Sequence, residues 1–207
     1  MAEQTKSKAE PPKPSDRAEE AVEVALKLFL ERGYDNTPMS LIAQELGLTK
    51  AGVYHHFESK EDLLYVIHRN NVERLLLPVI EKSEAEADPE VRLRTFMVEL
   101  GSLFARDPSA RILISEAKRM APEHFEEIRD VWRRGFVLAR DAIRELQQQG
   151  RCKESLNPTF AAFGAIGMCS WINYWFDHSR PESGPEVAAT MAEIFMNGVL
   201  VKAPRRS

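Results

Sequence analysis

Apolar residues recur through most of the chain at intervals of three and four, which places them along one face of an α-helix. No stretch alternates between apolar and polar residues for long enough to predict a β-sheet. Capping residues, glycines and prolines divide the periodic stretches from one another. The pattern therefore predicts an all-α fold of about nine helices, with starts at Ser15, Thr37, Thr49, Ser59, Asp88, Ser109, Pro122, Asn157 and Gly184.

Two very short helices joined by a tight turn follow the first long one. Thr37 is expected to cap the first of them, with Pro38 in its first turn. Gly47 stands where the chain must reverse, because glycine adopts a left-handed conformation at little cost. Thr49 is then expected to cap a second helix over residues 50–57.

The second short helix has an unusual exposed side. Val53 and Phe57 lie four residues apart and are expected to anchor it to a core. The other positions carry either almost no side chain or a hydrogen-bond donor, and no acidic residue lies between Glu45 and Glu58. A helix placed against a polyanion requires such a surface, although an ordinary surface helix is the alternative. The exposed residues are Lys50, Ala51, Gly52, Tyr54, His55 and His56.

The spacing of residues in this region resembles the DNA-binding domain of the TetR family of transcriptional regulators. The resemblance extends over residues 17–64 and implies a homodimer that binds a palindromic DNA operator with two recognition helices about 34–36 Å apart. With the helix pattern, it gives a disordered tail over residues 1–14, a helix-turn-helix DNA-binding domain over 15–60, and a ligand-binding and dimerisation domain over 61–203. The matching positions are Thr37-x-x-Ser40-x-Ile42-Ala43, Leu46-Gly47, Lys50-x-Gly52-x-Tyr54-x-His56-Phe57 and Ser59-Lys60-Glu61-x-Leu63.

The resemblance also implies which residues contact DNA. Lys50 and the backbone of Ala51 and Gly52 are expected to face base edges or nearby phosphates, and His55 is expected to reach either. Phosphate contacts set position on the duplex, whereas base contacts set specificity. The residues expected to hold phosphates are Thr37, Thr49, Tyr54, His56 and Lys60.

The overall charge does not itself indicate nucleic-acid binding. The 207 residues carry a net charge of −4, so a DNA contact must come from a local patch. Three lysines in the first 14 residues either touch a DNA backbone or remain solvated. Cys152 and Cys169 predict reduced thiols, and the charged N-terminus lacks the apolar segment of a signal peptide, so a cytoplasmic location is expected.

The fourth helix is predicted to bend. Its start, residues 59–62, has the form of a capping box, and Lys60 lies where backbone N–H groups point outward and suit a phosphate. Pro78 should kink or break the helix because proline lacks an N–H. In the TetR family this helix links the DNA-binding part to the rest, so a kink suits signal transfer. A bend imposed by packing is the alternative.

The eighth helix has almost no polar side. Over residues 160–176 only Ser170 and Asn173 carry ordinary polar side chains, so this helix must be buried on all sides. It is shorter than a membrane span. One chain cannot easily enclose a helix near its terminus, which predicts a second subunit and a four-helix bundle formed with the last helix about a two-fold axis. Gly164 and Gly167 would permit close helix approach.

Large apolar side chains recur at helical spacing in the larger domain. They are expected either to pack as core or, collectively, to line a cavity. TetR-family proteins typically bind a small ligand there, and the ligand releases DNA by favouring a conformation that DNA disfavours. The candidate ligand-binding residues are Met97, Phe104, Trp132, Phe136, Phe163, Met168, Trp171, Tyr174 and Trp175.

One segment indicates the class of ligand. Residues 171–176, WINYWF, look similar to family members that control fatty-acid or lipid breakdown and respond to acyl-CoA. A hydrophobic drug that controls an efflux system is the competing ligand. Basic side chains in the sixth and seventh helices are expected either to meet coenzyme A phosphates or to pair with surface carboxylates. They are Lys118, Arg119, Arg129, Arg133 and Arg134.

No arrangement of residues indicates an enzyme. The five histidines form no HExxH pattern and no cysteine–histidine metal spacing, and the chain lacks a glycine-rich phosphate loop and a nucleophile elbow. No cofactor or metal is expected. A helical interaction module without DNA binding would leave the exposed face from Lys50 to His56 unexplained. The sequence thus predicts a dimeric repressor that a hydrophobic effector such as an acyl-CoA releases from operator DNA.

Overall fold

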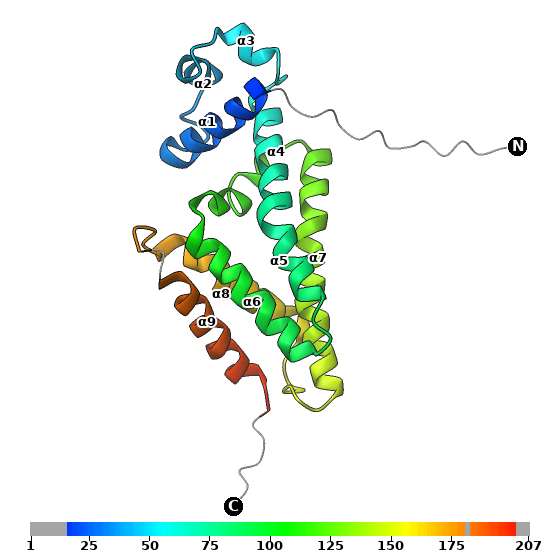
Figure 1. Cartoon of the computed structure of the whole chain (residues 1–207). Coiled ribbons are helices and arrows are strands. Elements are labelled where there is room, and N and C mark those ends of the chain that lie inside the picture. The colour runs from blue at the N-terminus through cyan, green and yellow to red at the C-terminus, as the bar shows by residue number, and fades with distance from the viewer. Residues whose placement is uncertain (1–15, 181–182, 202–207) are drawn as a thin grey trace, which may run out of the picture. The chain divides into compact units, whose positions relative to one another are not determined.

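The computed structural model describes residues 16–180 and 183–201, which form nine α-helices, one π-helical segment and two 3-10 helices (Figure 1). Within these residues there is no β-strand, and a single antiparallel bridge joins Cys152 to Leu200. The all-α prediction is therefore confirmed. The predicted tail over residues 1–14 and the predicted cap Ser15 lie outside the described residues. The chain divides into two compact units between Leu63 and Leu64.

The first unit is built from α1 (Asp16–Arg32), α2 (Met39–Glu45), α3 (Lys50–Tyr54) and the start of α4 (Lys60–Asn71). Its small core comes from the apolar face that each helix presents, and each buried large side chain contributes about 1.5–3 kcal/mol. Gly47 has a φ of +65° between α2 and α3, as expected for the reversal. The core residues, each at most 5% exposed, are Ala21, Ala25, Leu28, Phe29, Ile42, Ala43, Val53, Phe57 and Leu63.

The turn before α2 differs from the prediction. Pro38, not Thr37, is the N-cap of α2, and no side chain caps this helix. The Thr37 hydroxyl points back to the end of α1. It donates to the carbonyl oxygen of Gly33 at 2.9 Å, and the carbonyl oxygen of Leu28 lies at 3.3 Å. Thr37 therefore closes the turn between α1 and α2 instead of starting the next helix.

The fourth helix does not break at Pro78. Helical structure continues from α4 through a π-helical segment, Val72–Leu76, into α5 (Leu77–Glu84). Pro78 stands in the first turn of α5, and its missing N–H leaves the carbonyl of Arg74 without the usual helical donor. The wider π-helical turn directly before the proline accommodates this gap.

The second unit is organised around α6 (Pro89–Arg106), which contacts α5, α7, α8 and α9 (Figure 1). Asp88 caps it by accepting from the N–H groups of Glu90 and Val91 at 2.9 and 3.1 Å. Arg151 also pairs with Asp88 at 2.7 Å, and this guanidinium lowers the pKa of Asp88 to about 2. The α6 side chains at the centre of the core, each at most 1% exposed, are Leu93, Phe96, Met97, Leu100 and Phe104.

The predicted sixth α-helix is not formed. Residues Pro108–Leu113 and Ala117–Arg119 are two 3-10 helices, η2 and η3. Asp107 caps η2 by accepting from the N–H of Ser109 at 2.9 Å, so Ser109 is not the cap. Glu116 has a φ of +61°, a conformation that L-residues rarely adopt. This backbone prevents a continuous helix between α6 and α7.

The last three helices are α7 (Pro122–Gln148), α8 (Pro158–Trp175) and α9 (Gly184–Val199). Asn157 caps α8 by accepting from the N–H groups of Thr159 and Phe160 at 2.9 and 3.4 Å. On its inner side, α8 packs through a stripe of small residues and one isoleucine against α6 and α7. Among the described residues, no helix is long and apolar enough to cross a bilayer. The fully buried residues of α8 are Ala162, Ala165, Cys169 and Ile172.

Candidate nucleic-acid interface and effector site

The helix α3 is held in place by one cap and one apolar anchor. The Thr49 side chain accepts a hydrogen bond from the N–H of Gly52 at 3.1 Å, as predicted. Val53 is fully buried, and Phe57 follows it into the core after the helix has ended at Tyr54. The helix is thus shorter than the predicted 50–57, because the N–H groups of His56 and Phe57 both turn back to the Val53 carbonyl.

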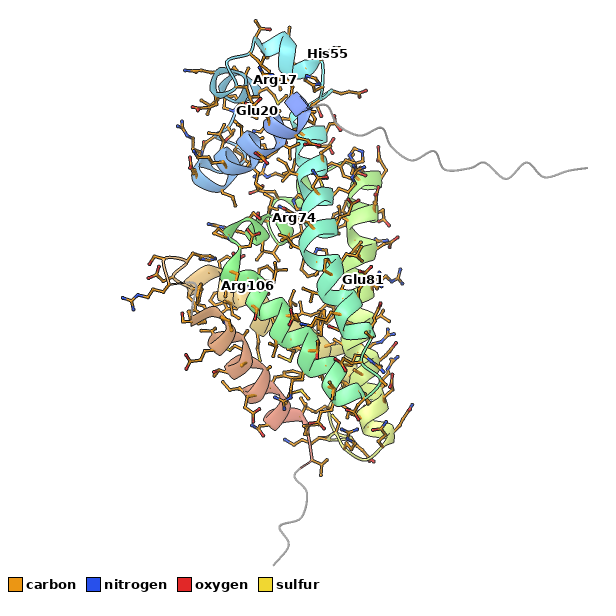
Figure 2. All side chains as sticks on the ribbon, viewed as in Figure 1. Arg17, Glu20, His55, Arg74, Glu81 and Arg106 are labelled. Atoms are coloured by element: carbon orange, nitrogen blue, oxygen red, sulfur yellow. The ribbon has the colours of Figure 1, made fainter. Side chains whose placement is uncertain are left out.

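The outer side of α3 consists of exposed donors around two small residues. Lys50, Ala51, Tyr54 and His55 are exposed, and Gly52 is half-buried. The Lys50 ammonium lies 5.7 Å from the centroid of the Tyr54 ring, so a cation and a phenol stand together one turn apart. His55, labelled in Figure 2, stands at the end of the helix. This face carries no carboxylate and leaves the helix backbone open to close approach.

The two histidines after the helix differ in exposure. His55 is exposed, whereas His56 is half-buried, and their rings meet edge to face with centroids 5.2 Å apart. The ring of His56 also lies near Phe57, at 6.5 Å between centroids. His56 is therefore less accessible than His55 and has an aromatic ring on each side.

Two residues predicted to contact phosphates make contacts within the domain instead. Thr37 is fully buried and its hydroxyl is bonded within the domain, so its side chain does not reach the surface. The Lys60 ammonium donates to the carbonyl oxygen of Tyr34 and lies 4.0 Å from the centroid of the Tyr34 ring. It also lies 5.9 Å from the ring centroid of Phe29. Both residues hold the α1–α2 turn in this structure.

The nine residues predicted to bind a ligand do not meet in one cavity. Met97 and Phe104 of α6 are fully buried, and their side chains are part of the core. Trp132, Phe136 and Met168 are half-buried. The remaining four lie on the outer side of α8 and are about half to two-thirds exposed: Phe163 59%, Trp171 62%, Tyr174 60% and Trp175 48%.

Three of the nine do line a common groove between α7 and α8. Trp132, Phe136 and Phe163 line an open groove of about 500 Å³, and the rings of Phe136 and Phe163 have centroids 4.7 Å apart. Arg129 and Arg133 stand at the same groove. An aromatic surface beside two guanidinium groups combines apolar contact with the capacity to bind an anion.

The basic residues of the sixth and seventh predicted helices are largely engaged with carboxylates. Arg119 pairs with Glu116 and Arg129 with Glu126, each three residues apart. The Arg134 guanidinium binds Glu84, with 2.8 Å between Nε and Oε1, and this bond lowers the pKa of the Glu84 carboxyl. These pairs are of the surface type that was the alternative to a coenzyme A contact.

Sequence reasoning missed a polar pair inside the second unit. His68 and Asn71 of α4 are 0% and 3% exposed. Among the described residues, both ring nitrogens of His68 lack a hydrogen-bond partner. The Nδ2 of Asn71 lacks one as well. Burial lowers the pKa of His68 to about 4, and a hydrogen-bond interaction with the Ser115 backbone that falls short of ordinary geometry opposes that shift. The signal was present in the sequence as two polar residues on the apolar side of α4.

The described residues contain no group of histidine, cysteine and carboxylate side chains that could hold a metal ion. The thiols are also ill suited to chemistry. Burial raises the pKa of the Cys169 thiol to about 12 and raises that of Cys152 as well. Thiolates are the reactive form, so both cysteines have the properties of core residues.

Two family models match the chain. The model described as bacterial regulatory proteins, tetR family, matches residues 21–66. The model described as tetracyclin repressor-like, C-terminal domain, matches residues 86–199, which is more than half of the 207 residues.

Proteins that align with nearly the whole chain are named as transcriptional or metabolic regulators. The HTH-type transcriptional repressor KstR2 of Mycolicibacterium smegmatis is 25% identical over 194 residues, which cover 91% of this chain and 93% of that protein. The fatty acid metabolism regulator protein of Bacillus subtilis is 22% identical over 183 residues, covering 86% and 93%. Among solved structures, AibR in complex with isovaleryl coenzyme A and operator DNA is similar, with a TM-score of 0.77 and 29% identity over 86% of this chain and 97% of that one.

The two family matches agree with the structure at both ends. The N-terminal match contains α2, the turn at Gly47 and the exposed donor face of α3. The C-terminal match contains α6 and three of the helices packed on it, α7, α8 and α9. The resemblance of the sequence is confirmed, and the chain belongs to the TetR family of helix-turn-helix transcriptional regulators.

Proposed function

We propose that this chain is a ligand-responsive repressor that binds a palindromic operator as a homodimer. The observation that carries the proposal is the outer face of α3, on which Lys50, Tyr54 and His55 are exposed beside Ala51 and the half-buried Gly52. Small residues allow the backbone to approach base edges, and the flanking donors suit phosphates. The relative KstR2 is named a repressor, which supports the direction of control.

The dimer is proposed to form through the outer side of α8 together with α9. Phe160, Phe163 and Trp171 are 72%, 59% and 62% exposed and lie along one side of α8. A row of large aromatic side chains on a helix is unusual on a monomeric surface and typical of an interface. On α9, Ile194 is 57% exposed. Two copies joined at these helices form the four-helix bundle that the apolar sequence of α8 predicts.

The effector is proposed to be a hydrophobic molecule of the acyl-CoA class. The groove lined by Trp132, Phe136 and Phe163 suits an apolar chain, and Arg133 at its edge suits a phosphate. The similar protein AibR was crystallised with isovaleryl coenzyme A and operator DNA. A hydrophobic drug remains the competing effector, since the apolar part of the groove alone would accept one.

Binding selection from random double-stranded DNA tests the proposal. We expect the selected sites to be inverted repeats with half-sites about one helical turn apart, bound by a dimer. Release of the selected DNA is then measured against isovaleryl-CoA, palmitoyl-CoA and a panel of hydrophobic drugs. Selection that yields no enriched sequence at low salt would overturn the regulator proposal in favour of an interaction module. Release by drugs but not by acyl-CoA thioesters would replace the proposed effector class.

A further inference from the structure

The polar pair in the last turn of α4 is not explained by the fold. Buried donors and acceptors in proteins nearly always have partners, and an orphan group costs about 1–3 kcal/mol. His68 and Asn71 leave three nitrogen atoms without a partner while being almost fully buried. They lie three residues apart and thus on one side of the helix. Leucine in place of His68 would avoid this cost, so His68 reduces the stability of the ligand-free chain.

The chemistry that the pair offers can be defined. Because the pKa of His68 is about 4, its ring is neutral near pH 7 and supplies one N–H donor and one acceptor. The Oδ1 of Asn71 accepts from Arg74 at 3.2 Å, so the unused part of Asn71 is its NH₂ group. The unused groups are therefore mainly donors. They match the oxygen of a carbonyl, which accepts two hydrogen bonds.

The charges around the pair favour a neutral carbonyl over a carboxylate. Arg74, labelled in Figure 2, reaches from the π-helical segment to Asp107 at 3.3 Å and to Ser109 at 3.2 Å. Arg69 lies beside Glu73, with 3.8 Å between Nε and Oε1. Both cations thus already have an anion within 4 Å, although the Nε of Arg69 makes no hydrogen bond. An ionised ligand placed against a neutral imidazole and an amide would lose its hydration without compensation.

The surroundings of the pair consist of irregular backbone. Asn71 directly precedes the π-helical segment Val72–Leu76, and π-helical turns occur frequently at functional sites. The backbone of Ser115, which is close enough to influence His68, lies between the 3-10 helices η2 and η3. The next residue, Glu116, holds a φ of +61°. Such segments rearrange at lower cost than a packed α-helix, and strained residues gather at ligand sites and switches.

We propose that His68 and Asn71 are the polar recognition site of the effector, at which their N–H groups donate to a neutral carbonyl oxygen such as that of a thioester. The site is closed in the ligand-free chain, and the segment from η2 to η3 moves aside when the effector enters. The inference rests on the proposal that this chain responds to a small-molecule effector of the acyl-CoA class.

The test compares ligands that differ only in the carbonyl. Palmitoyl-CoA and S-hexadecyl-CoA have the same chain length, but the thioether lacks the oxygen; isovaleryl-CoA and S-isopentyl-CoA form a second pair. Affinities are measured by calorimetry on the full chain for the wild type, His68→Leu, His68→Gln and Asn71→Leu. Ser83→Ala is the matched control, because Ser83 is also fully buried in the same helical run but bonds its own helix at the Val79 carbonyl.

We expect the wild type and Ser83→Ala to prefer a thioester over its thioether by about tenfold or more. His68→Leu and Asn71→Leu should lose most of that preference, and His68→Gln, which retains a donor, should keep part of it. The melting temperature of ligand-free His68→Leu should equal or exceed that of the wild type, because no hydrogen bond of ordinary geometry is lost. A structural histidine would give the opposite result, a lower melting temperature.

Three results would overturn the inference: a wild type that binds both members of a pair equally, a His68→Leu variant that retains the preference, or a His68→Leu variant that melts several degrees lower. The first of these leaves the proposed function intact, because the chain still binds the acyl-CoA class. A wild type that binds no member of either pair would instead contradict the proposed effector class, and the carbonyl site would fail with it.

Discussion

A Cβ atom placed on Gly101 would lie 3.0 Å from the Cβ of Ala188, closer than nearly all such contacts in proteins. The glycine of α6 and the alanine of α9 thus mark a place where the central helix and the last helix pack closely. The Ile172 side chain of α8 would be only 3.2 Å away as well. This point joins α6, α8 and α9.

We predict that Gly101→Val destabilises the chain by about 1–3 kcal/mol, because the added methyl groups must displace α9 or α8. Unfolding in urea, followed by circular dichroism, measures the change. Gly198→Ala is the comparison, since nothing lies within 4 Å of a Cβ at that position. It should leave the stability equal or slightly raised. Equal stability of Gly101→Val and the wild type would contradict the packing described for α6 and α9.

Tyr54→Phe should weaken binding to every DNA sequence by a similar factor. The phenol is exposed beside Lys50 and is proposed to hold a phosphate, so its loss removes about 1 kcal/mol, or roughly fivefold in affinity. Changes at Ala51 should instead alter operator preference. Competition binding against a set of operator variants separates the two. Equal loss on all sequences for an Ala51 variant would contradict the base-facing role of that residue.

Thr37→Val should lower stability and leave the affinity of the folded protein for DNA unchanged. Valine has nearly the same shape but cannot donate to the part-buried Gly33 carbonyl, and the lost hydrogen bond costs about 1 kcal/mol. Chemical denaturation gives the first quantity and titration with operator DNA the second. A large loss of affinity with unchanged stability would restore Thr37 as a phosphate contact.

Gly167→Leu should prevent dimerisation without harming the single chain. No atom lies within 4 Å of a Cβ at Gly167 in the single chain, and the residue is exposed, so a side chain can leave the helix there without a clash at its Cβ. In the proposed bundle the same position faces the second copy, where a larger side chain holds the helices apart. Sedimentation or native mass spectrometry reports the oligomeric state, and circular dichroism reports the fold. A dimer as tight as the wild type would place the interface elsewhere.

The stability of the chain should decrease as the pH falls from about 6.5 to 4, in part because of His68. The folded pKa of His68 is about 4, below the 6.5 of an unfolded histidine, so in this range the unfolded state binds a proton that the folded state excludes. The effect reaches about 3 kcal/mol at its full extent. The difference between the wild-type and His68→Leu stability curves isolates it, because the other groups, including Asp88, titrate in both. Parallel curves would show that His68 is not buried in solution.

Local sequence signals predicted the helices wherever one capping residue stands before a regular apolar stripe. Asp88, Thr49 and Asn157 all cap as expected because each precedes such a stripe. The predictions were wrong where a tertiary contact competes with the local signal. Thr37 has the sequence of a cap, but a carbonyl at the end of α1 takes its hydroxyl. Similarly, Asp107 and not Ser109 caps η2. The positive φ of Glu116 prevents residues 108–119 from forming one continuous helix.

The candidate DNA-binding face was accessible from sequence because it lies within a few residues of one helix. The effector region was not, since it depends on which sides of α7 and α8 meet. Phe136 and Phe163 are 27 residues apart in the sequence but line the same groove. Met97 and Trp171 are both large and apolar, yet Met97 lies in the core and Trp171 lies on the surface. Hydrophobicity alone does not distinguish these environments. The sequence places His68 on the apolar side of α4, but only the fold reveals that its side chain is buried without a partner.

The aromatic outer side of α8 has a consequence for how such a regulator responds to its own abundance. If two copies must meet over Trp171 and its neighbours before a palindrome can be bound, then operator occupancy at low expression rises with the square of the protein concentration. Halving the number of chains in a cell would reduce the bound fraction of operator about fourfold in that regime. The extent of repression would then depend on gene dosage and protein turnover as well as on the effector concentration.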